Sequence, residues 1–185
     1  MGLFFIPLVL GFSCNLASAF TTAYSRRLGE RGGSIVTVLL RDVFGIPVWA
    51  FGFVLASRTS APPFFASSRV TDLVAWLTVT AGGVIILLSL VTIRKRAFRP
   101  SARDAMVQSG LYAHVRHPIH SGTVLEFLGL FLLRPNWAIA AACAMGIVWV
   151  LVQTRFEEVD LLRRVPDYRA YMNRVPRFLP RFRAN

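Results

Sequence analysis

The chain has 185 residues, of which 55% are hydrophobic and only 16% are charged. A water-soluble domain carries about 25% charged residues and has no need of long uninterrupted apolar runs, so this composition excludes an ordinary soluble protein. The net charge of +12 would suit a nucleic-acid-binding protein, but the basic residues fall between apolar runs and in the tail, which is the distribution of a membrane protein.

The first two apolar runs cover residues 3–23 and 34–56. We expect the first to be a retained helix and not a cleaved signal peptide, because no basic residue precedes its apolar stretch. The second contains Arg41 and Asp42, which are costly in hydrocarbon and therefore face a bundle interior or a wet cavity. Two interpretations stay open for this pair: a structural ion pair near the membrane interface, or contact with a ligand.

The remaining runs are residues 70–93, 119–133 and 137–153. The run 70–93 would form a helix of about 36 Å, enough to cross a bilayer with some tilt. The last two are short and separated only by residues 134–136, so we expect a tight hairpin of two tilted helices. An amphipathic, arginine-rich tail begins at Gln153. The prediction is one all-α membrane domain, with three helices in 1–93 and a functional half in 94–185.

The distribution of Lys and Arg predicts the orientation of this domain. These residues number three, six and eight in segments 24–34, 94–118 and 153–185, against two and one in 57–69 and 134–136. The positive-inside rule places the first three segments in the cytoplasm. We therefore expect five transmembrane helices, an outer N-terminus and a cytoplasmic C-terminus. Because 20 of the 21 basic residues are arginine, we expect a bacterial cytoplasmic membrane.

All three histidines lie in one polar segment, at His114, His117 and His120. Membrane enzymes that use histidine clusters for metal need about twice as many ligands, and Pro118 disrupts a helix that would align the three, so we expect no metal site. One alternative is a plain helix entry with a proline in its first turn. The other is a pocket for an anionic group, built from helix N-terminal amides, Arg116 and the histidines.

Carboxylates supply the second group of candidate residues. Glu157 and Glu158 follow the last apolar run, and a hairpin of 119–133 and 137–153 brings them to the membrane face that holds the histidines. They either are solvated or bind an ammonium group of a ligand. Glu126 lies inside an apolar run, so it is either a pocket wall or a structural hydrogen-bonding group.

These motifs together resemble the isoprenylcysteine carboxyl methyltransferase and phospholipid methyltransferase superfamily of integral membrane enzymes. The resemblance covers about residues 97–182 and rests on the order and spacing of five pieces. They are Gly110 and Tyr112, then Arg116-His117-Pro118-Ile119-His120-Ser121-Gly122, then Glu157-Glu158, then Tyr168 and Tyr171, and finally Val175-Pro176 with Pro180.

The resemblance implies S-adenosylmethionine as methyl donor and a lipophilic, membrane-embedded acceptor. The positions of the basic residues give no reason to expect a nucleic-acid partner, and the oligomeric state stays open. The expected cofactor-binding residues are Asp104, Ala105, Met106, Val107, Tyr112, His117, Pro118, Ile119, His120, Gly122, Glu157 and Glu158. Arg116, Arg155 and Glu157 are the expected catalytic residues, and Gln153, Arg155 and Glu126 are expected to contact the acceptor.

The sequence departs from the family pattern at three places. His120 replaces a tyrosine, Val165-Pro166 replaces Phe-Gly, and Gln153 occupies the position of an arginine that handles a prenylcysteine carboxylate. The acceptor is therefore open between a carboxylate, an amine and a thiol. Two rival functions remain: an NADPH-dependent membrane sterol or steroid reductase, which shares the Arg-His-Pro element, and a non-enzymatic membrane protein with a relict site.

Overall fold

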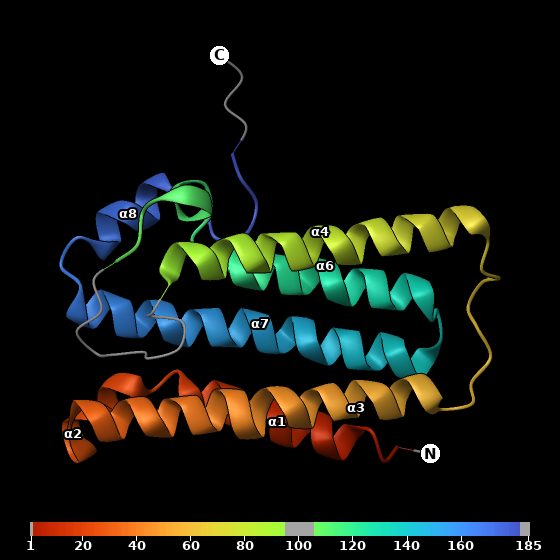
Figure 1. Ribbon diagram of the computed structural model, residues 1–185, viewed down its shortest axis with the longest axis horizontal. Coiled ribbons are helices and arrows are strands. Elements are labelled where there is room, and N and C mark those ends of the chain that lie inside the picture. The colour runs from red at the N-terminus through yellow and green to blue at the C-terminus, as the bar shows by residue number, and fades with distance from the viewer. Residues whose placement is uncertain (1, 95–105, 182–185) are drawn as a thin grey trace.

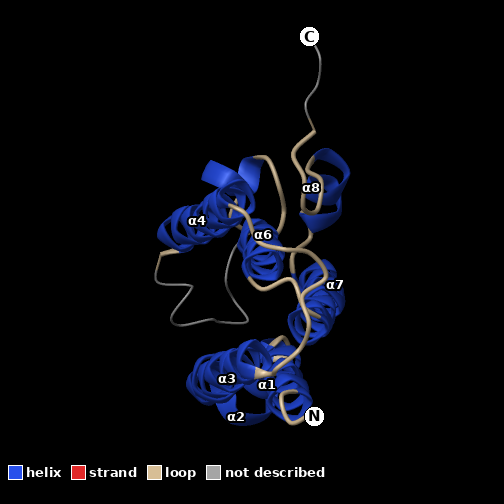
Figure 2. Cartoon of the chain, turned by 90° about the vertical axis from the view of Figure 1, so that its right-hand side faces the viewer, coloured by secondary structure: helices blue, strands red, loops and turns tan. Residues whose placement is uncertain are grey.

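The computed structural model describes residues 2–94 and 106–181, and within these ranges the regular structure is entirely helical. Long helices lie side by side along the longest axis of the molecule (Figure 1). Viewed along that axis, they form two groups with α7 between them (Figure 2). The predicted all-α class is confirmed.

The first group is a helical hairpin. It contains α1 (Phe5–Ser18), α2 (Thr21–Val38), the π-helix η1 (Leu39–Gly45) and α3 (Ile46–Arg58). The chain reverses at Gly29, whose φ of 74° belongs to the left-handed region that a residue with a Cβ avoids. The expectation of a loop over 24–34 was wrong, because the segment is helical on both sides of this one glycine.

Small residues let the two arms of this hairpin approach closely. A Cβ built on Gly11 would meet the backbone nitrogen of Trp49 at 2.4 Å, and one on Gly45 would meet Asn15 Nδ2 at 2.0 Å. The hydroxyls of Thr21 and Thr37 share a hydrogen bond of 2.9 Å nearer the turn. Close packing and hydrogen bonds of this kind commonly hold membrane helices together, because the hydrophobic effect contributes little to their association within lipid.

The second group pairs α4 (Arg69–Ile93) with α6 (Pro118–Leu133). α4 begins with a capping box in which Ser68 and Thr71 bond each other's backbone amides, and α6 begins at a proline, a residue suited to the first helical position. The two helices touch backbone to backbone, since a Cβ on Gly82 would lie 2.6 Å from the carbonyl oxygen of Gly122. The predicted bounds of these two helices agree with the structure within one residue.

Helix α7 (Trp137–Arg164) joins the two groups. Phe12 of α1 stacks on Trp149 of α7 with 5.1 Å between ring centroids, while Cys143 of α7 donates to the carbonyl of Phe127 on α6. The expectation of a helix ending at residue 153 was wrong by three turns. Charged residues lower the hydropathy of this extension but are good helix formers, so the helix continues to Arg164.

Opposite ends of the bundle carry different structures (Figure 1). One end holds the 3₁₀ turn η2 (Gly110–Ala113), the short helix α8 (Tyr168–Arg174) and the C-terminal tail. At the other end, Phe64 donates to the carbonyl of Pro135 at 2.6 Å, so the α3–α4 and α6–α7 connections meet there.

The helices are apolar enough for an integral membrane protein. Three stretches have the length and hydropathy to cross a bilayer: Thr21–Arg58, Arg69–Ile93 and Trp137–Arg164. α1 and α6 are apolar but shorter. Many large apolar side chains point outward from these helices, as expected where lipid is the solvent.

Candidate active site

A cavity of about 720 Å³ opens where the two helix groups diverge near the η2–α8 end. The volume falls within the range of about 300–1,000 Å³ that small-molecule sites occupy. Its walls come from α1, η1 and α3 on one side, from α4 and α6 on the other, and from α7, η2 and α8. Among the residues that line it are Asn15, Ser18, Arg41, Asp42, Trp49, Ile86, Leu90, Ile93, Met106, Val107, Tyr112, Arg116, His117, Ile119, His120, Thr123, Glu126, Trp149, Gln153, Glu157, Leu161, Tyr168 and Tyr171.

One stripe of α7 supplies a long polar wall. Trp149, Gln153, Glu157 and Leu161 recur every four residues, so the helical period places them on one face, and all four line the cavity. Gln153 is only 5% exposed and donates through Nε2 to Glu157 Oε1 at 3.0 Å. The second oxygen of Glu157 thus remains turned toward the histidines.

A stripe of α6 faces this wall. His117 is the residue before α6, and His120, Thr123 and Glu126 follow at intervals of three, all on the cavity side. The stripe carries polar groups from the mouth of the cavity deep into the apolar bundle. Glu126 fits there because Gly82 and Gly83 of α4 leave room beside it.

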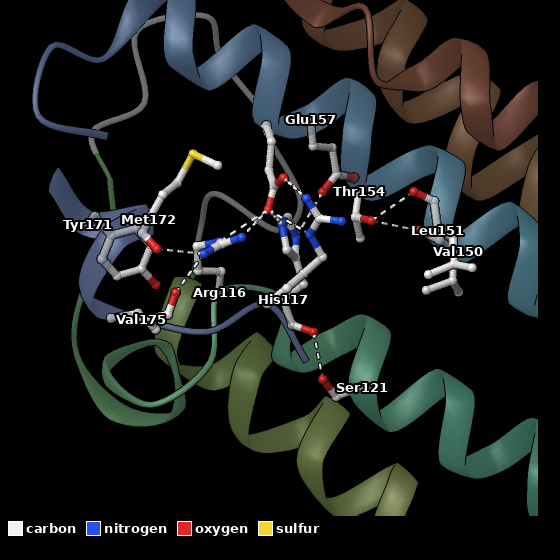
Figure 3. Close-up of polar contacts among 12 residues, drawn as sticks. Arg116, His117, Ser121, Val150, Leu151, Thr154, Glu157, Tyr171, Met172 and Val175 are labelled. Atoms are coloured by element: carbon white, nitrogen blue, oxygen red, sulfur yellow. Dashed lines mark hydrogen bonds and ion pairs between the residues drawn. The ribbon is translucent and has the colours of Figure 1, made fainter. Parts of the chain in front are cut away.

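Arg116 and His117 take part in a buried ion network (Figure 3), whose central acceptor is Glu158. Its side chain is 3% exposed and accepts hydrogen bonds from Arg116 at 2.9 and 3.1 Å and from Arg177 Nε at 3.0 Å. A second Arg177 nitrogen, Nη2, bonds the other carboxylate oxygen. Arg116 also donates to the carbonyls of Met172 and Val175 at 2.9 and 2.6 Å. Both arginines therefore help to hold the tail against α7 and against the start of α6.

His117 lies between the two glutamates. Its Nδ1 is 3.5 Å from Glu157 Oε2, and its Nε2 is 3.2 Å from Glu158 Oε1. Burial lowers the pKa of His117, but the hydrogen bonds and charges of the two carboxylates outweigh burial and raise it above the usual value. The site therefore favours positive charge at this position.

The tail covers the start of α6 and so closes one side of the site. The amides of Arg116 and His117 donate to the carbonyls of Pro176 and Arg177 at 2.8 and 3.1 Å, and the Ser121 hydroxyl donates to the carbonyl of Phe178 at 2.8 Å. Burial raises the pKa of Tyr171 to about 12, so its phenol keeps the proton that it donates to the Tyr112 carbonyl at 2.6 Å. The backbone amides of Arg116 and His117, which directly precede α6, are thus already bonded to the tail.

The part of the chain that carries the site matches a known protein family. The profile of the family described as phospholipid methyltransferase matches residues 72–165, which is half of the chain. The chain belongs to this family, within the superfamily of membrane methyltransferases that the motifs indicated. The match runs from the first turn of α4 to the end of α7, so it contains both polar stripes but not the α1–α3 hairpin or the tail.

A curated relative extends the similarity. The cobalt-zinc-cadmium resistance protein CzcN of Cupriavidus metallidurans is 31% identical over 142 residues, which is 74% of this chain and 63% of that protein. The chain thus spans less than two thirds of this relative's length. No solved structure matches the sequence.

Most of the family residues expected from sequence gather in one place. Those lining the cavity are Met106, Val107, Tyr112, Arg116, His117, Ile119, His120, Glu126, Gln153 and Glu157. Asp104 and Ala105 lie outside the described residues. Pro118, Gly122 and Glu158 do not line the cavity; they form the start of α6, its contact with α4 and the ion network. Arg155 does not join the site either, because its exposed side chain lies outside the cavity lining.

The α1–α3 hairpin contributes a wall that the motifs did not indicate. Asn15, Ser18 and Trp49 line the cavity together with Arg41 and Asp42. The latter two form an ion pair at 2.8 Å within η1, which agrees with the structural interpretation of this pair, while its contact with a ligand stays a prediction. Polar residues inside an apolar run were the available signal; nothing in the sequence distinguished Trp49 from a lipid-facing tryptophan.

Three buried polar atoms of the cavity wall have no hydrogen-bond partner within the described chain. They are Gln153 Oε1 and the Nε1 atoms of Trp49 and Trp149. A buried polar atom without a partner costs about 1–3 kcal/mol, so these atoms are places where an ordered water or a bound molecule would supply a missing bond. All three flank the space between the hairpin wall and the two polar stripes.

Proposed function

We propose that the protein transfers a methyl group from S-adenosylmethionine to a lipophilic acceptor that reaches the cavity from the membrane. The observation that carries this proposal is the cavity itself: the motif residues of a membrane methyltransferase line one part of it, and apolar and tryptophan side chains line the rest. Among methyl transfers to lipophilic acceptors, we propose an activity like that of isoprenylcysteine carboxyl methyltransferases.

The polar part of the cavity suits the donor. Glu157 is 32% exposed, opens to the cavity and would take the ammonium group of the methionine portion. The unpartnered Gln153 Oε1 offers a further acceptor, and Tyr112, His117 and His120 complete the surroundings. When bound, this cofactor supplies a methyl group already activated on a sulfonium. The residues of the chain therefore need only align the donor with the acceptor and exclude water.

The other part of the cavity suits the acceptor. α4 contributes Ile86, Leu90 and Ile93, which fit an aliphatic chain, while Trp49 and Trp149 offer indole N–H donors. Glu126 stands at the deep end, so it would contact a polar head group in place of the expected Arg155. Arg116 would act as a positioning residue, since its donors are spent on Glu158 and on the tail.

The proposed topology has five crossings, an outer N-terminus and a cytoplasmic active site in a bacterial membrane. Contact between the 57–69 and 134–136 connections supports it, because both carry few basic residues and meet at the end opposite the cavity. The polar donor would enter from the cytosol, and the acceptor from the lipid.

Calorimetric binding to detergent-purified protein tests the function. We expect micromolar binding of S-adenosylhomocysteine, no binding of NADPH, and at least tenfold weaker binding of S-adenosylhomocysteine to Glu157→Gln, because that change removes a charge-assisted contact worth about 1.5–3 kcal/mol. Arg169→Gln, an exposed position on α8 outside the cavity, is the matched control. Binding of NADPH without binding of S-adenosylhomocysteine would contradict the methyltransferase proposal and favour a reductase. Binding of neither by a folded protein would favour a relict site.

A further inference from the structure

We propose that His117, His120 and Glu157 form a site for a four-coordinate divalent transition-metal ion, and that this ion and the methyl donor exclude each other. Each of the three side chains offers a donor atom within 4.8 Å of the other two. The expectation of no metal site considered the three histidines alone, whereas the fold brings Glu157 of α7 beside two of them. Two imidazoles and one carboxylate are a common set of three protein ligands for Zn²⁺, with the fourth position left to water. Only the exclusion rests on the proposed function; the metal site stands without it.

The surroundings of His117 prepare one of its nitrogens for a metal. Nε2 lies 3.2 Å from Glu158 Oε1, an acceptor that Arg116 and Arg177 hold in place. Because the two carboxylates favour the protonated ring, an incoming ion must displace the Nδ1 proton to solvent. The ring then keeps its Nε2 proton, donates it to Glu158 and presents the Nδ1 lone pair toward Glu157. Metal-binding histidines characteristically donate their other N–H to a carboxylate, which fixes the ring and strengthens the ligand.

Glu157 is held in a similar way. Gln153 donates to its Oε1 at 3.0 Å and leaves Oε2 on the side of His117. A ligating carboxylate is usually hydrogen-bonded through its other oxygen, and such support is worth about 10–100-fold in metal affinity. Both of these ligands therefore already have the supporting hydrogen bonds of a built site.

His120 completes the set. Its ring packs against His117 and Trp149, with 5.8 and 5.9 Å between centroids, and makes no hydrogen bond within the described chain. Tetrahedral zinc holds its ligand atoms about 3.3 Å apart. Binding therefore requires the His120 ring to turn inward by on the order of 1 Å, into the cavity that it lines.

Occupancy by the ion would change what else the cavity binds. Glu157 is the carboxylate proposed to take the donor's ammonium group, and a coordinated cation neutralises and blocks it. The apparent dissociation constant of the donor then rises in proportion to the free metal concentration once that concentration exceeds the metal's own dissociation constant. Methyl transfer in such a protein responds to cytoplasmic metal.

Cobalt(II) absorption tests the site, because tetrahedral and octahedral Co²⁺ have different visible spectra. The tag-free, detergent-purified full chain is titrated with Co²⁺. We expect tetrahedral bands, at least tenfold weaker Co²⁺ binding by His120→Phe and His120→Gln, and wild-type binding by His114→Phe, a change at an exposed histidine outside the cavity. Circular dichroism and melting temperature establish that each variant is folded.

Addition of S-adenosylhomocysteine tests the exclusion, and we expect it to bleach the tetrahedral bands. An octahedral spectrum, or bands that persist in both folded His120 variants, would overturn the metal site while leaving the proposed function intact. Tetrahedral bands that survive saturation with S-adenosylhomocysteine would overturn the exclusion. If S-adenosylhomocysteine does not bind at all, the proposed function fails, and bands that depend on His120 still support the metal site.

Discussion

At the scale of single residues, Glu158 and Glu157 are neighbours with different tasks. Glu158 points away from the cavity into a cage of two arginines and His117, and Glu157 points into the cavity. A pair of adjacent carboxylates on a helix cannot face the same way, since consecutive residues lie about 100° apart. We therefore propose a binding role for the first of the pair, while the second holds the segments of the site together.

Removal of Arg116 tests the assembly role. Arg116→Ala leaves Glu158 buried with one arginine fewer and frees two carbonyls, so we expect a loss of unfolding free energy of about 3 kcal/mol. Denaturant titration in detergent, followed by tryptophan fluorescence, measures it. Arg169→Ala on the exposed face of α8 should change the same quantity by less than about 0.5 kcal/mol. Equal stability of the two variants would contradict the role.

Glu126 tests the acceptor part of the cavity. Glu126→Gln keeps the shape of the side chain and removes its charge, so we expect methyl transfer to the acceptor to fall at least tenfold. The affinity for S-adenosylhomocysteine should change less than twofold, because Glu126 lies two helical turns from His120 along α6. Parallel calorimetry and radiolabelled methyl transfer separate the two effects; a matched fall in both would assign Glu126 to the donor.

At the scale of helices, Gly82 and Gly83 form a natural matched pair in α4. A Cβ on Gly82 would meet Gly122 O at 2.6 Å, whereas one on Gly83 has Glu126 Oε1 at an ordinary 3.7 Å. We expect Gly82→Ala to cost about 1–3 kcal/mol of unfolding free energy by forcing α4 away from α6. Gly83→Ala should be neutral or slightly stabilising. The same denaturant titration compares them, and indistinguishable variants would show that the helices separate without cost.

How well each helix was predicted depended on how clearly the sequence marks its two ends. α4 and α6 have strong start signals, a capping box and a proline, and the ends of their apolar runs match their last residues, so their bounds were predicted well. α7 continues past the membrane through charged residues, which hydropathy treats as an end although they are helix formers. The motifs located the α6 and α7 stripes of the site. The contribution of the α1–α3 hairpin to the cavity was not predicted. Which side chains a helix turns toward a segment distant in sequence depends on tertiary packing, and local sequence patterns do not show it.

At the scale of the whole molecule, the two ends of the bundle should lie on opposite sides of the membrane. In a chain carrying Cys14→Ala and Cys143→Ala, we expect Ser67→Cys to react with an impermeant maleimide in intact bacterial cells. Asn173→Cys on α8 should react only after permeabilisation. Both positions are exposed, so access is decided by the membrane alone. The reverse pattern would invert the proposed orientation.

The attachment of the tail to the start of α6 affects the order in which the site assembles during synthesis. Residues 176–178 supply carbonyls to Arg116, His117 and Ser121, and Arg177 bonds to Glu158. During translation α6 and α7 are synthesised before these residues. A nascent chain that has reached the end of α7 therefore holds the motifs of both helices but lacks the segment that fixes them together. The pocket is complete only once the segment after α8 has been added and has bound to the start of α6.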